Sequence, residues 1–149
     1  MRFIGTLSCA VLLLIAIPAA QERASFAGIW TAAAPNAQRL IIEQDATLLR
    51  ITDSRNRVLT YRLDGSESRN QTTTVRGETW NHVSRARWVS SALVIITTTT
   101  REAGQQWDWM TIYRRDGQGN LLVTTLDAVL DPGPFQAMAM STVEFKKAS

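Results

Sequence analysis

The sequence predicts an all-β fold in which antiparallel strands follow one another as a meander. Apolar and polar residues alternate through much of the chain after residue 20, and no segment there shows the 3.6-residue period of an amphipathic helix. Turn sequences such as Asp64-Gly65 and Asp116-Gly117 separate the alternating segments. We expect the meander to close into a barrel of about 8–10 strands, because closure removes exposed sheet edges. A two-sheet β-sandwich is the alternative.

The first predicted strands form a hairpin and its neighbour. Residues 40–42 are apolar, residues 43–46 form a short polar turn, and residues 48–52 return to a strand pattern. Another strand is predicted over residues 58–63, where Leu59, Tyr61 and Leu63 share one face. The Asp-Gly pair that follows ends this strand at a turn.

The segment from residue 78 to residue 88 is the most informative strand. Its two faces differ, because one carries Arg85 and Arg87 and the other carries Trp80, His82, Ser84, Ala86 and Trp88. We expect the second set to face the interior, since successive side chains of a strand point to opposite sides. After a turn at Ser90-Ser91, the apolar residues 93–96 run into four threonines. Threonine favours strands, so the next strand is predicted to continue through residue 100.

The last predicted strands carry two more tryptophans. Trp107, Trp109 and Tyr113 share one face of a strand, and Met110 and Ile112 compete for the interior from the other face. By analogy with Tyr61, which lies with two leucines, we expect the first set to face inward. Residues 121–126 and 138–146 complete the meander, with a loop at residues 131–134 between them.

Residues 1–20 have the features of a secretory signal peptide. Arg2 precedes the apolar run of residues 10–17, and the small residues Ala19 and Ala20 lead into a polar segment. The apolar run is shorter than the roughly 20 residues of a membrane-spanning helix. We therefore expect an exported, periplasmic or extracellular protein, with residues 21–149 as a single β-barrel domain and no membrane span after cleavage. An uncleaved anchor is the alternative.

Composition narrows the remaining possibilities. The 149 residues include 16 basic and 13 acidic side chains, and the basic residues are scattered. This balance gives no indication of nucleic acid as a partner. The chain has one His, and its one Cys, Cys9, lies inside the predicted leader. We therefore expect neither a disulfide framework nor a metal centre, and no cofactor.

Several ordered blocks of the sequence resemble a known family. They are residues 26–30 (Phe-Ala-Gly-Ile-Trp), residues 61–67 followed by Asn70, residues 84–88, residues 93–99, Asp116-Gly117 and residues 143–147. Together these blocks resemble a family of small exported bacterial proteins, mostly uncharacterised and often described as lipocalin-like. The resemblance implies a lipocalin-like β-barrel and no particular activity. Trp107 and Trp109 stand where the resemblance leads us to expect small or polar strand residues, so any ligand preference of the family is less transferable to this chain.

The sequence contains no catalytic motif that we recognise. A Gly-x-Ser-x-Gly nucleophile elbow is absent, and His82 lies within a predicted strand beside Trp80 and Ser84. Most carboxylates fall in turns or on polar strand faces, where solvation explains them. A non-enzymatic protein is therefore expected, although a triad assembled from distant positions is an alternative that residue order leaves open.

Five tryptophans are the unusual feature of the composition. Such rings are large hydrophobic groups that fill cores, and they also line ligand cavities. The ligand-binding interpretation predicts a site for a small hydrophobic or aromatic molecule, lined by Trp80, His82, Ser84, Trp88, Trp107, Trp109 and Tyr113. The alternatives are a cell-envelope structural or interaction module with a packed interior, and an unrecognised enzyme. A binding protein should have an open interior, and an enzyme should have a cleft where His82 meets a carboxylate.

Overall fold

The computed structural model describes residues 23–33, 37–101, 103–128 and 138–148. The predicted leader and the predicted loop at residues 131–134 lie outside these residues. The described residues form no helix and ten strands, which are β1 (Gly28–Ala32), β2 (Arg39–Gln44), β3 (Leu48–Thr52), β4 (Val58–Arg62), β5 (Glu67–Thr73), β6 (Thr79–Val89), β7 (Ala92–Arg101), β8 (Gln106–Arg115), β9 (Leu121–Ala128) and β10 (Met138–Lys147).

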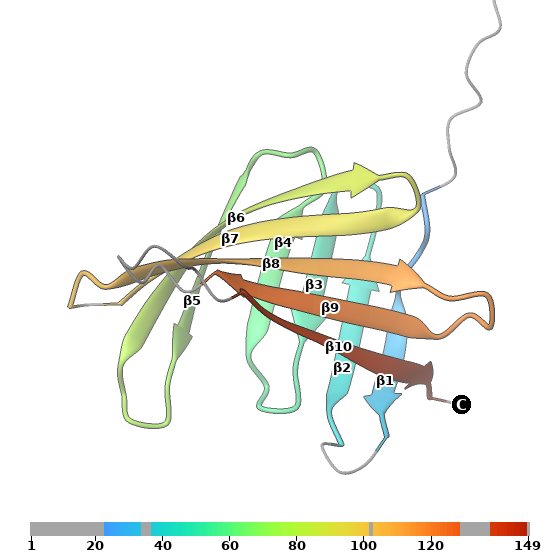
Figure 1. The fold of residues 1–149 in the computed structure, drawn as a ribbon, viewed down its shortest axis with the longest axis horizontal. Helices are drawn as coiled ribbons and strands as arrows, with labels where there is room; N and C mark the ends of the chain where they lie inside the picture. The colour runs from blue at the N-terminus through green and yellow to red at the C-terminus, as the bar shows by residue number, and fades with distance from the viewer. Residues whose placement is uncertain (1–22, 34–36, 102, 129–137, 149) are drawn as a thin grey trace, which may run out of the picture.

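All ten strands belong to one antiparallel sheet in the order β4-β3-β2-β1-β10-β9-β8-β7-β6-β5. Each strand pairs with its neighbours in the chain, except that β1 pairs with β10 and no ladder joins β4 to β5. The sheet curls so that β7 to β10 cross in front of β2 to β4 (Figure 1). The predicted all-β meander and its barrel are therefore confirmed. Strands β1 and β5 carry no clear alternation and were not identified from the sequence.

The barrel closes between β4 and β5 through side chains. The Asn70 amide bonds both main-chain groups of Thr60, because Thr60 N donates to Oδ1 at 2.8 Å and Nδ2 donates to the carbonyl of Thr60 at 2.9 Å. Two residues further along the same junction, the main-chain N of Arg62 donates to Oγ of Ser68 at 2.7 Å. These bonds satisfy edge groups that would otherwise lack a strand partner. We call this junction the β4–β5 seam.

One half of the barrel interior is packed with apolar side chains. Phe26, Trp30, Leu93 and Phe145 are at most 2 % exposed, and Tyr113 is also buried among them. The ring of Phe26 stacks on Trp88 at 5.7 Å, and Trp30 donates its indole N–H to the carbonyl of Phe26 at 2.8 Å. This half, which we call the packed half, supplies most of the hydrophobic stabilisation.

The interior changes character along the strands. On β7 the inward side chains run from Leu93 and Ile95 to Thr97 and Thr99, all buried. Thr97 pairs in register with Ser84 on β6, and the two hydroxyls are hydrogen-bonded at 2.8 Å. Small hydroxyl side chains fill less volume than leucines, so the other half of the barrel has a polar lining and spare room. We call it the open half.

Replacing Asn70 by Ala tests the seam. The variant leaves a main-chain donor and acceptor of Thr60 unpaired, and we expect its free energy of unfolding in urea to fall by about 1–3 kcal/mol. Asn81→Ala is the matched control, since the exposed Asn81 side chain bonds only the exposed Gln71 amide among the contacts described. Equal losses in the two variants would contradict a special role for the seam.

Candidate functional site

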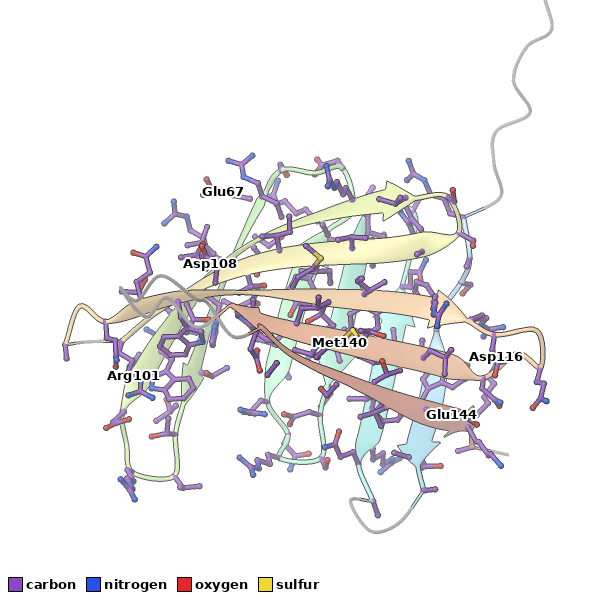
Figure 2. The ribbon with its side chains drawn as sticks, in the orientation of Figure 1. Glu67, Arg101, Asp108, Asp116, Met140 and Glu144 are labelled. Atoms are coloured by element: carbon purple, nitrogen blue, oxygen red, sulfur yellow. The ribbon has the colours of Figure 1, made fainter. Side chains whose placement is uncertain are left out.

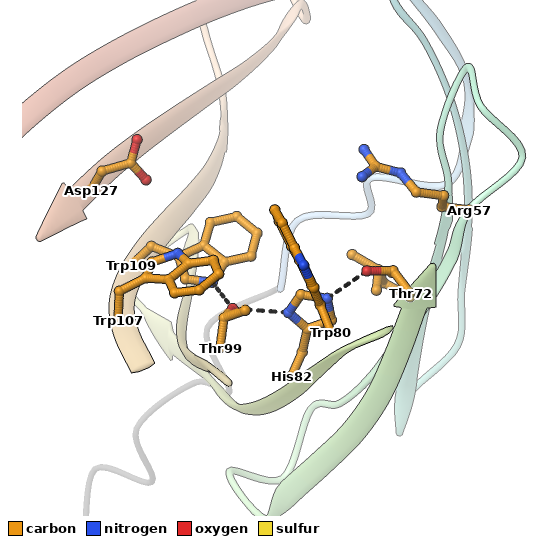
Figure 3. Close-up of a pocket in the computed structure, with 9 residues that line it drawn as sticks. Arg57, Thr72, Trp80, His82, Thr99, Trp107, Trp109 and Asp127 are labelled. Carbon is orange, nitrogen blue, oxygen red and sulfur yellow. Dashed lines mark hydrogen bonds between the residues drawn. The ribbon is translucent and has the colours of Figure 1, made fainter. Parts of the chain in front are cut away.

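The open half contains a cavity of about 220 Å³. It lies at the opposite end of the strands from Phe26 and Trp30, and Figure 3 shows its side chains converging from several strands. Its walls are formed by Arg57, Leu59, Thr72, Trp80, His82, Thr99, Trp107, Trp109 and Asp127. Other hollows of the described surface are lined mainly by exposed polar and charged residues of turns and outer faces.

A chain of hydrogen bonds runs across one wall of the cavity. Nε2 of His82 lies 2.9 Å from Oγ1 of Thr72, and Nδ1 lies 2.9 Å from Oγ1 of Thr99. Trp109 donates its indole N–H to the same Thr99 oxygen at 3.0 Å. The chain joins β5, β6, β7 and β8 and fixes the orientation of both rings, as the dashed lines in Figure 3 show for these side chains.

His82 is held in its neutral form. Burial lowers the pKa of its imidazole, and the nearby positive charge of Arg57 lowers it further. A neutral ring has one N–H donor and one acceptor nitrogen, and each threonine hydroxyl can act in either role. Thr99 can therefore accept from Trp109 and donate to His82, which satisfies the whole chain without a net charge.

Tryptophan rings form the remaining wall. Trp80 and Trp107 meet edge to face with centroids 5.3 Å apart. The guanidinium of Arg101 lies over both rings, 4.8 Å from the Trp80 centroid and 5.2 Å from that of Trp107. These contacts hold the two indoles as a wall. The indole N–H of Trp80 is buried and has no hydrogen-bond partner among the described residues.

Two charged side chains flank the cavity from opposite sides. Arg57 precedes β4 and forms an ion pair with Asp53, with Nη2 2.6 Å from Oδ2 and Nε 2.7 Å from the same oxygen. Asp127 is exposed near the end of β9, where it pairs in register with Trp109 of β8. Figure 3 shows the guanidinium and this carboxylate facing each other across the space above the indoles.

The sequence-predicted site residues divide between the two halves. Trp80, His82, Trp107 and Trp109 line the cavity. Ser84 lies beneath it and bonds Thr97. Trp88 and Tyr113 pack on Phe26 in the packed half, outside the cavity lining. All seven side chains point into the barrel, as predicted. The sequence did not show that they lie at different heights along the barrel axis.

Five lining residues were not predicted from the sequence. Thr72 lies on β5, a strand without apolar alternation, and Thr99 was identified as a strand residue only. Arg57 and Asp127 are charged residues near strand ends, which resemble ordinary solvated positions. Leu59 was expected to face the core. Only the strand register brings these five residues together.

The chain matches no protein-family model, and no curated protein matches it significantly. The described residues include no cluster of three or more His, Cys, Asp or Glu side chains suited to hold a metal ion. Within the same residues, no helix is long and apolar enough to cross a membrane.

The neutral state of His82 predicts a pH-dependent stability. The unfolded chain takes up a proton at histidine near pH 6.5, whereas the folded protein resists it until lower pH. Protonation thus favours unfolding, and the free energy of unfolding should fall as pH drops from about 7 to about 5. The slope should approach about 1.4 kcal/mol per pH unit between the two pKa values, measured by urea denaturation at each pH.

The control is His82→Asn, which removes the chain's one histidine. Its slope over this interval should vanish, whatever its overall stability. The carboxylates whose pKa is lowered by hydrogen bonds, Asp45, Asp53, Asp64 and Asp116, titrate below the interval. An unchanged slope in the variant would show that His82 is not the titrating group.

Proposed function

We propose that this protein is a non-enzymatic binding protein that takes up one small hydrophobic or aromatic molecule in the cavity of the open half. The observation that carries the proposal is the contrast between the two halves of one barrel. Aromatic and aliphatic side chains fill the packed half, whereas Trp80, Trp107 and Trp109 stand along the wall of a cavity in the other. The leader-like pattern of residues 1–20 supports export of the protein to the periplasm or the extracellular space.

The size of the cavity limits the ligand. Pockets for drug-sized molecules typically measure about 300–1,000 Å³, and this cavity measures about 220 Å³. A molecule built on a single ring fits that volume better than a lipid or a porphyrin. The flat indole rings favour an apolar or aromatic group that packs against them face to face or edge to face.

The contacts of His82 favour binding over catalysis. Both ring nitrogens are occupied by threonine hydroxyls, and no carboxylate bonds the imidazole among the described residues. A general base of the triad type needs a carboxylate or similar group that stabilises the imidazolium, and here a neutral threonine hydroxyl occupies that position. Here the pKa of His82 is lowered instead, which suits a neutral structural ring.

An interaction module is the second candidate, and the outer face of the sheet favours it. Ile96, Met110, Leu126 and Met140 follow one another in register across β7, β8, β9 and β10. Met140 is 71 % exposed and lies on the outside of β10 (Figure 2). Ile96 is also exposed, Met110 and Leu126 are half-buried, and a row of apolar side chains that reach the surface is typical of a contact surface. If this surface carries the function, Met140→Ser should abolish partner capture and leave cavity binding unchanged.

The indole N–H resonances test the binding proposal. In ¹H–¹⁵N spectra we expect single-ring aromatic compounds to shift the indole signals of Trp80, Trp107 and Trp109. The signals of Trp30 and Trp88, in the packed half, serve as internal controls and should stay in place. Equal movement of all five signals, or of none, would contradict binding in the cavity.

A pair of variants separates binding from packing. Trp107→Ala should weaken the affinity for a compound found in that screen by about tenfold or more, equivalent to about 1.4 kcal/mol. Trp88→Ala removes a ring stacked on Phe26, so it should lower the melting temperature and leave the affinity within about twofold, because it creates a hole only in the packed half. Calorimetric titration of both variants measures the difference. Equal losses of affinity would argue against the cavity as the site.

A further inference from the structure

We infer that the ligand of the open half is a small zwitterion, with an ammonium group and a carboxylate at opposite ends of one apolar or aromatic group. This inference rests on the proposed function, since it names the class of molecule that the same cavity accepts. It is carried by the placement of one guanidinium and one carboxylate on opposite sides of an indole-walled space.

The carboxylate side of the cavity is suited to an ammonium group. Asp127 stands directly across the strand pair from Trp109, on the same inward face of the sheet. An ammonium beside this carboxylate would also lie near the indole ring of Trp109, and cations are attracted to indole faces. The guanidinium of Arg101 already makes this cation–π contact with Trp80 and Trp107. Trp109 is therefore the indole of this wall that remains for a cation of the ligand.

The guanidinium side is suited to a carboxylate. Asp53 accepts from Nε and Nη2 of Arg57, both through its Oδ2, and thereby fixes the guanidinium in the direction of the cavity. The Nη1 group and the second hydrogen of Nη2 lie outside those two contacts. A ligand carboxylate can accept from them with charge-assisted bonds. Because the ion pair with Asp53 fixes the arginine beforehand, little side-chain entropy is lost on binding.

The space between the charges is apolar and uncharged. Leu59 and the indoles of Trp80 and Trp107 surround it, and His82 below is neutral. An anionic ligand would leave Asp127 partly desolvated without a partner, and a cationic one would forgo the charge-assisted bonds that Arg57 can donate beyond its ion pair with Asp53, so each should bind more weakly.

Four phenyl compounds that differ in charge test the inference. The zwitterion is 4-(aminomethyl)phenylacetate, the cation 4-methylbenzylamine, the anion 4-methylphenylacetate and the neutral member 4-methylbenzyl alcohol. In calorimetric titrations at pH 7 and low salt, we expect 4-(aminomethyl)phenylacetate to bind at least about tenfold more tightly than each of the other three, because only this compound carries opposite charges at its two ends. Shifts of the indole N–H signals of Trp80, Trp107 and Trp109 confirm the site.

The outcomes separate this inference from the proposed function. If one of the singly charged or neutral compounds binds in the cavity as tightly as 4-(aminomethyl)phenylacetate, the assignment of a zwitterionic ligand is wrong and the binding function stands. If none of the four compounds moves the three indole signals, both are overturned.

Charge-removing variants give the matched control. Asp127→Asn should reduce the affinity for 4-(aminomethyl)phenylacetate about tenfold, to the level of 4-methylphenylacetate, and leave 4-methylphenylacetate unaffected or bound more tightly. Arg57→Gln should have the converse effect, with 4-methylbenzylamine as the unaffected compound. Glu43→Gln and Arg87→Gln change exposed charges outside the cavity lining and should alter none of the affinities. If the distant variants changed the affinities as much as the lining variants do, the effect would come from the net charge of the protein, and the inference would be wrong.

Discussion

The hydrogen-bond chain through Thr72, His82, Thr99 and Trp109 is the interaction on which the open half depends. A closed sheet turns every second side chain into its interior, and a polar group buried there without a partner costs about 1–3 kcal/mol. This series of hydrogen bonds gives partners to both imidazole nitrogens and to one indole N–H, and it joins four strands. It therefore allows a half of the barrel to remain polar and unfilled, with the Trp109 ring fixed at the wall rather than collapsed into the space.

Under the proposed function, stability and binding belong to different ends of the same strands. The packed half, around Phe26, Trp30 and Phe145, buries the large apolar side chains. The seam between β4 and β5 closes the cylinder through Asn70 and Ser68, in place of a main-chain ladder. The chain's one cysteine lies at residue 9, so the described domain has no disulfide to supplement these contacts. A cavity can be tolerated because the apolar contacts are concentrated at the other end of the strands.

Much of the fold follows from local patterns, whereas the site depends on register. Alternation placed Trp80, His82, Trp88 and Tyr113 on inward faces correctly, since that property needs only neighbours in sequence. It could not place them along the barrel axis: Trp80 and Trp88 share a face, yet eight residues of strand separate them by roughly 26 Å. Strand β5 was missed because its inward residues, Ser68, Asn70 and Thr72, are all polar. Asp127 joins the site through its pairing with Trp109, which no local pattern reveals.

The central claim is that the open half holds a small molecule, and mass spectrometry under non-denaturing conditions tests it most directly. The protein would be purified gently from cells that produce it, together with a Trp107→Ala variant prepared in the same way. The account predicts one non-covalent small molecule per chain in the wild-type protein and its loss from the variant. The same adduct retained at full occupancy by Trp107→Ala, or bare protein that also binds no single-ring compound added back, would contradict the account.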